Sequence, residues 1–137
     1  MKLYTQKILK LTTEIPRIGR IDKADKIVSI RSPICGSSVT IYINKKKGEI
    51  SDFKQEIRAC ALGQASASIL ASNIIGINYS KICELHKSVQ DMLEKGSSPP
   101  PPPFSKYELL RPACEFKNRH ASIMLVLNAA KEALQDS

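Results

Sequence analysis

A strict alternation of apolar and polar side chains runs through the segment VTIYIN, residues 39–44. This period of two is typical of a β-strand with one buried face. A lysine-rich turn at residues 45–48 follows, and apolar residues between 50 and 57 predict a returning strand whose irregular spacing leaves room for a β-bulge. A short apolar run at residues 27–30 predicts one more strand before this hairpin. The centre of the chain is therefore expected to form a small antiparallel sheet.

Helical periodicity surrounds these strands. Pro16 is expected to end the first helix, Ser80 to cap the third at its N-terminus, and Gly96 to stop it. Apolar residues three and four apart predict helices over residues 3–13, 61–76, 80–95 and 120–134. A helix, a three-stranded antiparallel sheet and then several helices indicate an α+β fold with the helices packed on one face of the sheet.

The 137 residues are enough for a single domain spanning 1–137. The tract at residues 97–103 contains five consecutive prolines, which favour an extended polyproline II conformation. We interpret it as a stiff connector within the domain, with a ligand for a proline-recognition module as the alternative.

Charge and composition narrow the class of function. The formal net charge is +8, and residues 1–58 carry 13 basic and six acidic side chains. Aromatic residues make up only 5% of the chain, so stacking on nucleic-acid bases is not expected, and no apolar run is long enough for a membrane span. The N-terminal segment has no secretory pattern, which predicts a cytoplasmic protein with reduced cysteines.

Residues with metal-binding chemistry occur where the predicted elements meet. Cys35 lies between the first two strands beside Gly36, which permits positive φ and lets backbone N–H groups approach a sulfur. Cys60 lies where the last strand gives way to a helix, and the positive end of a helix dipole favours a thiolate. His120 begins the last helix. Such junctions can converge at one end of a small α+β sheet.

Cys83 and His86 are three residues apart on a predicted helix, a spacing that permits shared metal ligation. Cys83 stands between the apolar Ile82 and Leu85, so we interpret it as a packing residue.

Three segments, SPICGSSVTIYI, RACALGQASASIL and RHASIMLVLNAAKEAL, resemble in this order the core domain of NifU/IscU-type iron–sulfur cluster assembly scaffolds. The resemblance spans about residues 4–135. It implies a three-stranded antiparallel sheet with helices on one side, in agreement with the elements predicted above. It further implies a bound [2Fe–2S] cluster or zinc ion, sulfur supplied by a cysteine desulfurase, and apo iron–sulfur proteins as acceptors.

The resemblance also assigns residues. Cys35 and Cys60 match the first and second ligand cysteines, and His120 matches the histidine of the family's His-Cys pair. The chain departs from the pattern at Ala121, where the family has its third cysteine, and at Ser37, where it has aspartate. Both changes remove side chains to which the family assigns a role at the cluster.

Cys114 is a candidate for the missing ligand, because it precedes His120 by six residues. If its loop folds back, Cys35, Cys60, Cys114 and His120 would give four sulfur and nitrogen ligands for zinc or one side of a cluster. The alternative is a half-buried loop thiol.

The sequence therefore predicts an iron–sulfur cluster scaffold or carrier rather than an enzyme. It leaves open a homodimer with a shared site. The alternative function is a degenerate NifU-like paralogue that acts as an interaction or regulatory module without a cluster. A weaker third alternative is a basic nucleic-acid-binding domain.

Overall fold

The computed structural model describes residues 3–33 and 36–135. Within these ranges the elements, in chain order, are α1 (Gln6–Thr13), β1 (Lys26–Arg31), β2 (Ser38–Lys46), β3 (Glu49–Arg58), α2 (Ala61–Ser72), α3 (Tyr79–Lys95), the 3₁₀ segments η1 (Ser105–Glu115) and η2 (Lys117–Arg119), and α4 (His120–Leu134). The predicted α+β class is confirmed.

The sheet of the described chain has the strand order β1-β2-β3, with both pairs antiparallel. The side chains of Val39, Ile41 and Ile43 are almost fully buried, as the alternation predicted. The register shifts between Asn44 and Lys45, which confirms a bulge close to the turn. Lys47 and Gly48 form the tip, both with positive φ, which suits the right-handed twist of a hairpin.

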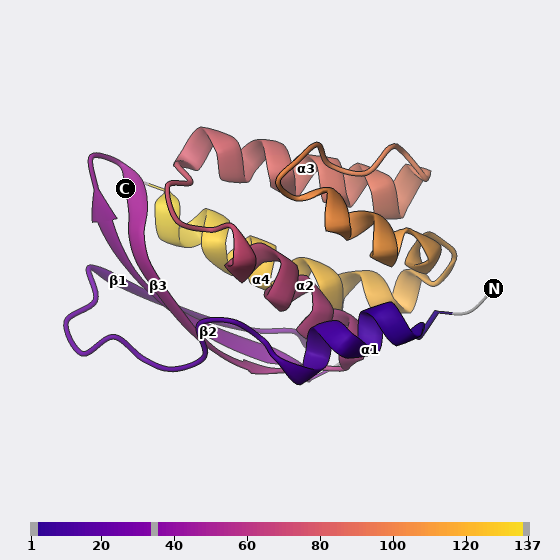
Figure 1. Ribbon diagram of the computed structural model, residues 1–137, viewed down its shortest axis with the longest axis horizontal. Coiled ribbons are helices and arrows are strands. Elements are labelled where there is room, and N and C mark those ends of the chain that lie inside the picture. Colours follow the sequence, from indigo (N-terminus) through magenta and orange to yellow (C-terminus); the bar gives the residue numbers. More distant parts are fainter. Residues whose placement is uncertain (1–2, 34–35, 136–137) are drawn as a thin grey trace.

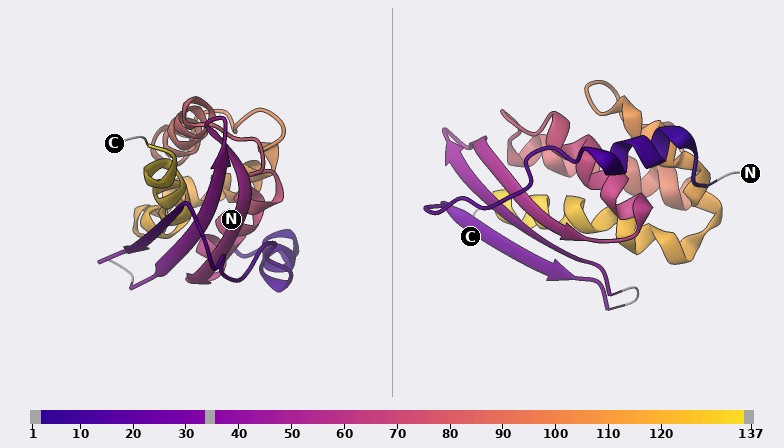
Figure 2. Two further views of the ribbon diagram at one scale, coloured as in Figure 1. Left: turned by 90° about the vertical axis from the view of Figure 1, so that its left-hand side faces the viewer. Right: turned by 60° about the horizontal axis from the view of Figure 1, so that its bottom comes forward.

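The helices cover one face of this sheet (Figures 1 and 2). Helix α4 packs against β1 and β2, α2 packs against β3 and α4, and α3 lies over α4. Helix α1 packs beside α2. One apolar core fills the space between the sheet and α2 and α4, so the first turns of α2 and α4 have fixed positions relative to the sheet.

The opposite face of the sheet carries a polar cluster. Tyr42 Oη donates a hydrogen bond of 2.7 Å to Glu56 Oε1, and Arg20 Nε lies 3.1 Å from Glu56 Oε2. Backbone hydrogen bonds join Gly19 N to Gln55 O and Gln55 N to Arg17 O. The segment before β1 is thereby attached along the free side of β3.

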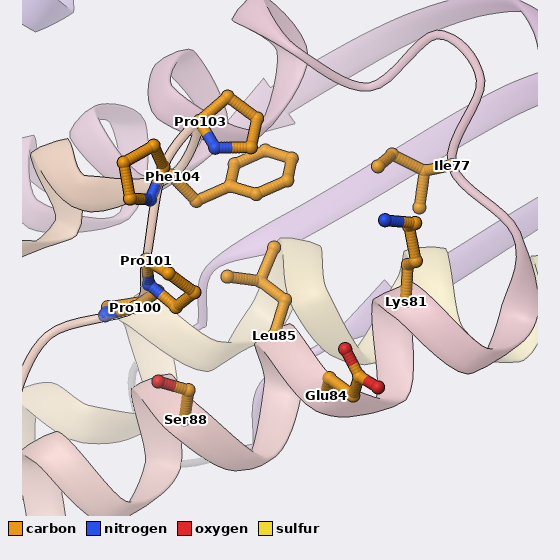
Figure 3. A pocket seen from close by; sticks show the side chains of 10 residues that line it. Ile77, Lys81, Glu84, Leu85, Ser88, Pro100, Pro101, Pro103 and Phe104 are labelled. Carbon is orange, nitrogen blue, oxygen red and sulfur yellow. The ribbon is translucent and has the colours of Figure 1, made fainter.

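The proline tract packs against α3 rather than standing clear of the molecule. Pro100 is buried, and Phe104 after the tract is only 7% exposed. The prolines, Phe104 and Leu85 of α3 line a cavity of about 220 Å³ (Figure 3). Its walls are largely apolar, with Lys81 and Glu84 at one side.

Three predicted boundaries were wrong. Helix α1 begins at Gln6 rather than at residue 3, because Thr5 Oγ1 caps it by accepting a hydrogen bond of 3.2 Å from Ile8 N. Helix α2 ends at Ser72, four residues before Gly76. The N-cap of α3 is Asn78 rather than Ser80, because Asn78 Oδ1 accepts a hydrogen bond of 2.9 Å from Lys81 N. The predicted stop at Gly96 is confirmed, since its φ of 68° is left-handed.

Candidate functional site

Cys60 forms the N-cap of α2, with extended backbone angles of φ −65° and ψ 171°. Its half-buried side chain leaves the sheet end of β3 and reaches α4, where Cys60 Sγ lies 3.2 Å from Ser122 Oγ. The sulfur of Cys60 thus lies at the N-terminus of α2 and in contact with the first turn of α4.

Gly63 explains why the starts of α2 and α4 can lie this close. A Cβ at this position would stand 2.5 Å from Ser122 Oγ and 2.7 Å from the Cβ of Ala59. Sequence reasoning missed Gly63 and Ser122. The available signal was a glycine inside an otherwise Ala-rich helix, which often indicates close packing against another backbone.

His120 is the first residue of α4, as predicted. Its Nε2 lies 2.8 Å from the carbonyl oxygen of Ala113. A carbonyl only accepts, so Nε2 carries the proton and Nδ1 retains a lone pair in the neutral ring. Metal-binding histidines commonly fix their second ring nitrogen in this way. The imidazole is therefore oriented and has one nitrogen free of this bond.

Cys35 lies outside the described residues, which stop at Pro33 and resume at Gly36. Gly36 has a φ of 72°, as expected, and its N–H donates to Ser32 O at 2.9 Å. Ser38, at the start of β2, pairs with Arg58 at the end of β3. The β1–β2 connection is thus at the end of the sheet from which the chain continues to Cys60.

Cys114 is half-buried near the end of η1, directly after the carbonyl that holds His120. Among the described side chains, no three His, Cys, Asp or Glu residues form a group able to hold a metal ion. The predicted set of four also includes Cys35, which is not among them. Participation of Cys114 therefore stays a prediction.

The second cysteine–histidine pair is engaged elsewhere. His86 Nε2 lies 2.6 Å from Asn128 Oδ1. A hydrogen bond with the Cys83 thiol raises the pKa of Tyr79 above its ordinary value. Cys83 and His86 therefore have separate partners, while the interpretation of the half-buried Cys83 as a packing residue stays a prediction.

The donor types at the α2 and α4 starts, a thiol and an oriented imidazole, fit zinc and iron–sulfur groups, which prefer sulfur and nitrogen ligands. In the described part of the chain, no helix has both the length and the apolar character needed to cross a membrane.

Comparison with known proteins identifies a family and several relatives of this chain. The NifU-like N-terminal domain family matches residues 3–105. The iron–sulfur cluster assembly scaffold protein IscU of Thermotoga maritima is 26% identical over 133 residues, covering 97% of this chain and 93% of that protein. The scaffold protein IscU 1 of Archaeoglobus fulgidus is 31% identical over 67 residues, 49% of this chain and 44% of that protein.

Solved structures match over almost the whole chain. A NifU-like N-terminal protein from Brucella abortus superposes with a TM-score of 0.93 at 32% identity, covering 96% of this chain and 92% of that one. A structure from Fervidobacterium islandicum has a TM-score of 0.87 at 23% identity and covers 97% of each chain, which supports the fold alone.

Proposed function

Since this chain belongs to the NifU-like N-terminal domain family, we propose that it is a scaffold on which iron–sulfur clusters are assembled. The cluster is then cargo that the protein holds and passes on. The Thermotoga maritima relative, aligned over 97% of this chain, carries this function in its name. The observation that carries the proposal is the contact of Cys60 with Ser122, which joins the thiol to the first turn of the helix that His120 begins.

The proposed ligands are Cys35, Cys60 and His120, with Cys114 as a fourth. Thiolates and a neutral imidazole suit zinc as well as one side of a [2Fe–2S] cluster. The bound group would supply the redox or Lewis-acid chemistry. The chain contributes orientation: Ala113 holds the His120 ring, and Ser122 contacts the sulfur of Cys60.

The proposed partners follow from this role. A cysteine desulfurase would supply sulfur, and apo iron–sulfur proteins would accept the cluster. The protein would act as a carrier in the cytoplasm rather than as an enzyme, and a homodimer could complete a site that lacks the third cysteine at position 121.

Anaerobic reconstitution with ferrous iron, cysteine and a cysteine desulfurase tests this function. We expect visible absorption and matched iron and sulfide contents in the native protein. Cys35→Ser, Cys60→Ser and His120→Ala should each lower the iron content about tenfold or more, in the range seen when metal sites lose supporting groups. Cys83→Ser is the matched control and should leave it unchanged.

Two results would contradict the proposal. One is a native protein that binds no iron, sulfide or zinc. The other is binding that survives the Cys35, Cys60 and His120 substitutions as well as it survives Cys83→Ser. The Cys114→Ser variant tests the fourth ligand separately. If its metal affinity equals that of the native protein, Cys114 is not a ligand, and the proposal for the other three residues is unaffected.

The second candidate function is an interaction or regulatory module that carries no cluster. It is favoured by Ala121, which stands where the family has its third cysteine. Its distinguishing result is a stable complex with the desulfurase without any uptake of iron or zinc. Ala121→Cys separates the two functions further, because a site that lacks only this thiol should gain cluster content when the thiol is restored.

A further inference from the structure

A lysine-rich groove of about 420 Å³ lies between α1, α2 and η1, apart from the candidate metal site. Ser68, which lines it, is eight positions along the chain from Cys60. This corresponds to roughly 12 Å along a helix at 1.5 Å per residue. The groove is therefore at the other end of α2 from the thiol, and its properties do not depend on the proposed scaffold function.

Positive charge dominates the groove. Lys7 and Lys10 approach it from α1 and Lys106 from η1, while Glu14 is the carboxylate on its wall. Within residues 3–33 and 36–135, none of these lysines forms an ion pair. Ammonium groups held around one concavity, with little compensating charge, raise the local concentration of anions.

A serine hydroxyl lies at the same groove. Ser68 is only 3% exposed and lines the groove, yet its side chain has no hydrogen-bond partner in the described chain. Its neighbour one turn on, Ser72, uses its hydroxyl to donate to Ser68 O at 2.8 Å. Because Ser68 Oγ has no partner within the described chain and lies at the groove, it offers an unused donor to an anion there.

The remaining wall is apolar, with Leu11, Pro16 and Leu109 beside the lysines. We propose that this groove binds a diphosphate group, carried either by a nucleotide or as free pyrophosphate. The several ammonium groups suit an anion with several charges, and lysine serves proteins as a point-charge ligand for phosphate. The apolar wall offers a surface on which a nucleotide base could lie.

Isothermal titration calorimetry of the full chain with ADP, pyrophosphate and adenosine tests the proposal at low salt. We expect ADP to bind and added salt to weaken it, because the attraction is largely between charges. If pyrophosphate binds with an affinity within about threefold of that of ADP, the diphosphate group alone is sufficient for binding. If it binds about tenfold more weakly, the nucleotide is the preferred ligand. Adenosine binding as tightly as ADP would overturn the proposal.

Variants locate the site. Lys7→Glu with Lys10→Glu should weaken ADP binding about tenfold or more. Lys23→Glu with Lys46→Glu makes the same charge change at exposed positions outside the groove and should leave the affinity within about threefold. Equal weakening in both double variants, or no binding of either phosphate by the native protein, would overturn the assignment.

Ser68→Ala separates binding from folding. Because the hydroxyl makes no internal hydrogen bond in the described chain, its loss should leave the urea unfolding midpoint unchanged while weakening ADP binding about threefold to tenfold. A Ser68→Ala protein that binds ADP as tightly as the native chain would contradict the site.

Discussion

At the scale of single residues, the first turns of α2 and α4 meet at Gly63. Ser122 Oγ and Ala59 Cβ both occupy space that a Cβ at position 63 would need. Cys60 and His120 were recognisable in the sequence because their residue types have distinctive chemistry and stand at element boundaries. Ser122 was not, since a serine in an apolar helix gives no sign of a partner 62 residues earlier.

Gly63→Ala should therefore destabilise the protein by about 1–3 kcal/mol, as overpacking of a tight contact does. Alanine is the better helix former by about 1 kcal/mol, so a purely local effect would have the opposite sign. Urea unfolding at neutral pH measures the change.

A Ser122→Ala background is the control for this substitution. Removing the hydroxyl relieves one of the two close approaches, so Gly63→Ala should be less harmful there. A stabilising Gly63→Ala in the native background would show that the two helices have room to separate.

At the scale of elements, strongly periodic segments were predicted best. Helix α4 spans His120–Leu134 as expected, and the strands agree within three residues at each end. The 3₁₀ segment η1 was not predicted: Pro112 lies within it, and its buried residues Tyr107, Leu110 and Ala113 recur every three positions, the period of a 3₁₀ helix rather than of an α-helix. The cap of α3 was misplaced for a different reason.

Asn78 and Ser80 are both good N-cap residues, and sequence alone does not rank them. In the structure, the segment that contains the Asn78 cap also contacts β3. Asn78 forms an isolated β-bridge with Glu49, and Ile50 N donates a hydrogen bond of 3.0 Å to Ile77 O. These contacts hold the chain just before α3 beside the start of β3.

Asn78→Ala should lower the free energy of unfolding by about 1 kcal/mol, because Lys81 N loses its side-chain acceptor. Ser80→Ala is the matched control within the same turn and should change it by less than about 0.5 kcal/mol. Thermal or urea unfolding of the two variants measures both values, and a larger loss for Ser80→Ala would restore Ser80 as the cap.

At the scale of the whole molecule, side chains from distant segments join the layers. Lys26 Nζ lies 3.2 Å from Glu132 O and 3.1 Å from Gln135 O, so β1 binds the carbonyl end of α4. Arg20, Tyr42 and Glu56 join the segment before β1 to the outer sheet face. Such pairs could not be predicted from the sequence, because many other pairings of basic and acidic side chains were equally compatible with it.

The Glu56 cluster should make stability depend on pH. The hydrogen bond from Tyr42, and then that from Arg20, lowers the pKa of Glu56 below its ordinary value. A carboxyl with a depressed folded pKa stabilises above its unfolded pKa, and this contribution is lost as pH falls through the folded value.

Glu56→Gln should therefore be less stable than the native chain near neutral pH, and the difference should disappear in acid below the folded pKa of Glu56. Urea unfolding across this range measures it. Glu115→Gln is a suitable control, since Glu115 is exposed and has no ion pair within the described chain. A difference between the native and Glu56→Gln proteins that persists unchanged in acid would contradict the expected sign.

The bulge between Asn44 and Lys45 stands next to the hairpin tip, whereas Ser38 is at the other end of β2. The eight steps between its nine residues, at about 3.3 Å each, put some 26 Å between the two ends. The hairpin tip is thus remote from the junction at which Cys60 begins α2. A fluorophore or an immobilisation handle attached at Lys47 is therefore expected to leave the surroundings of Cys60 undisturbed.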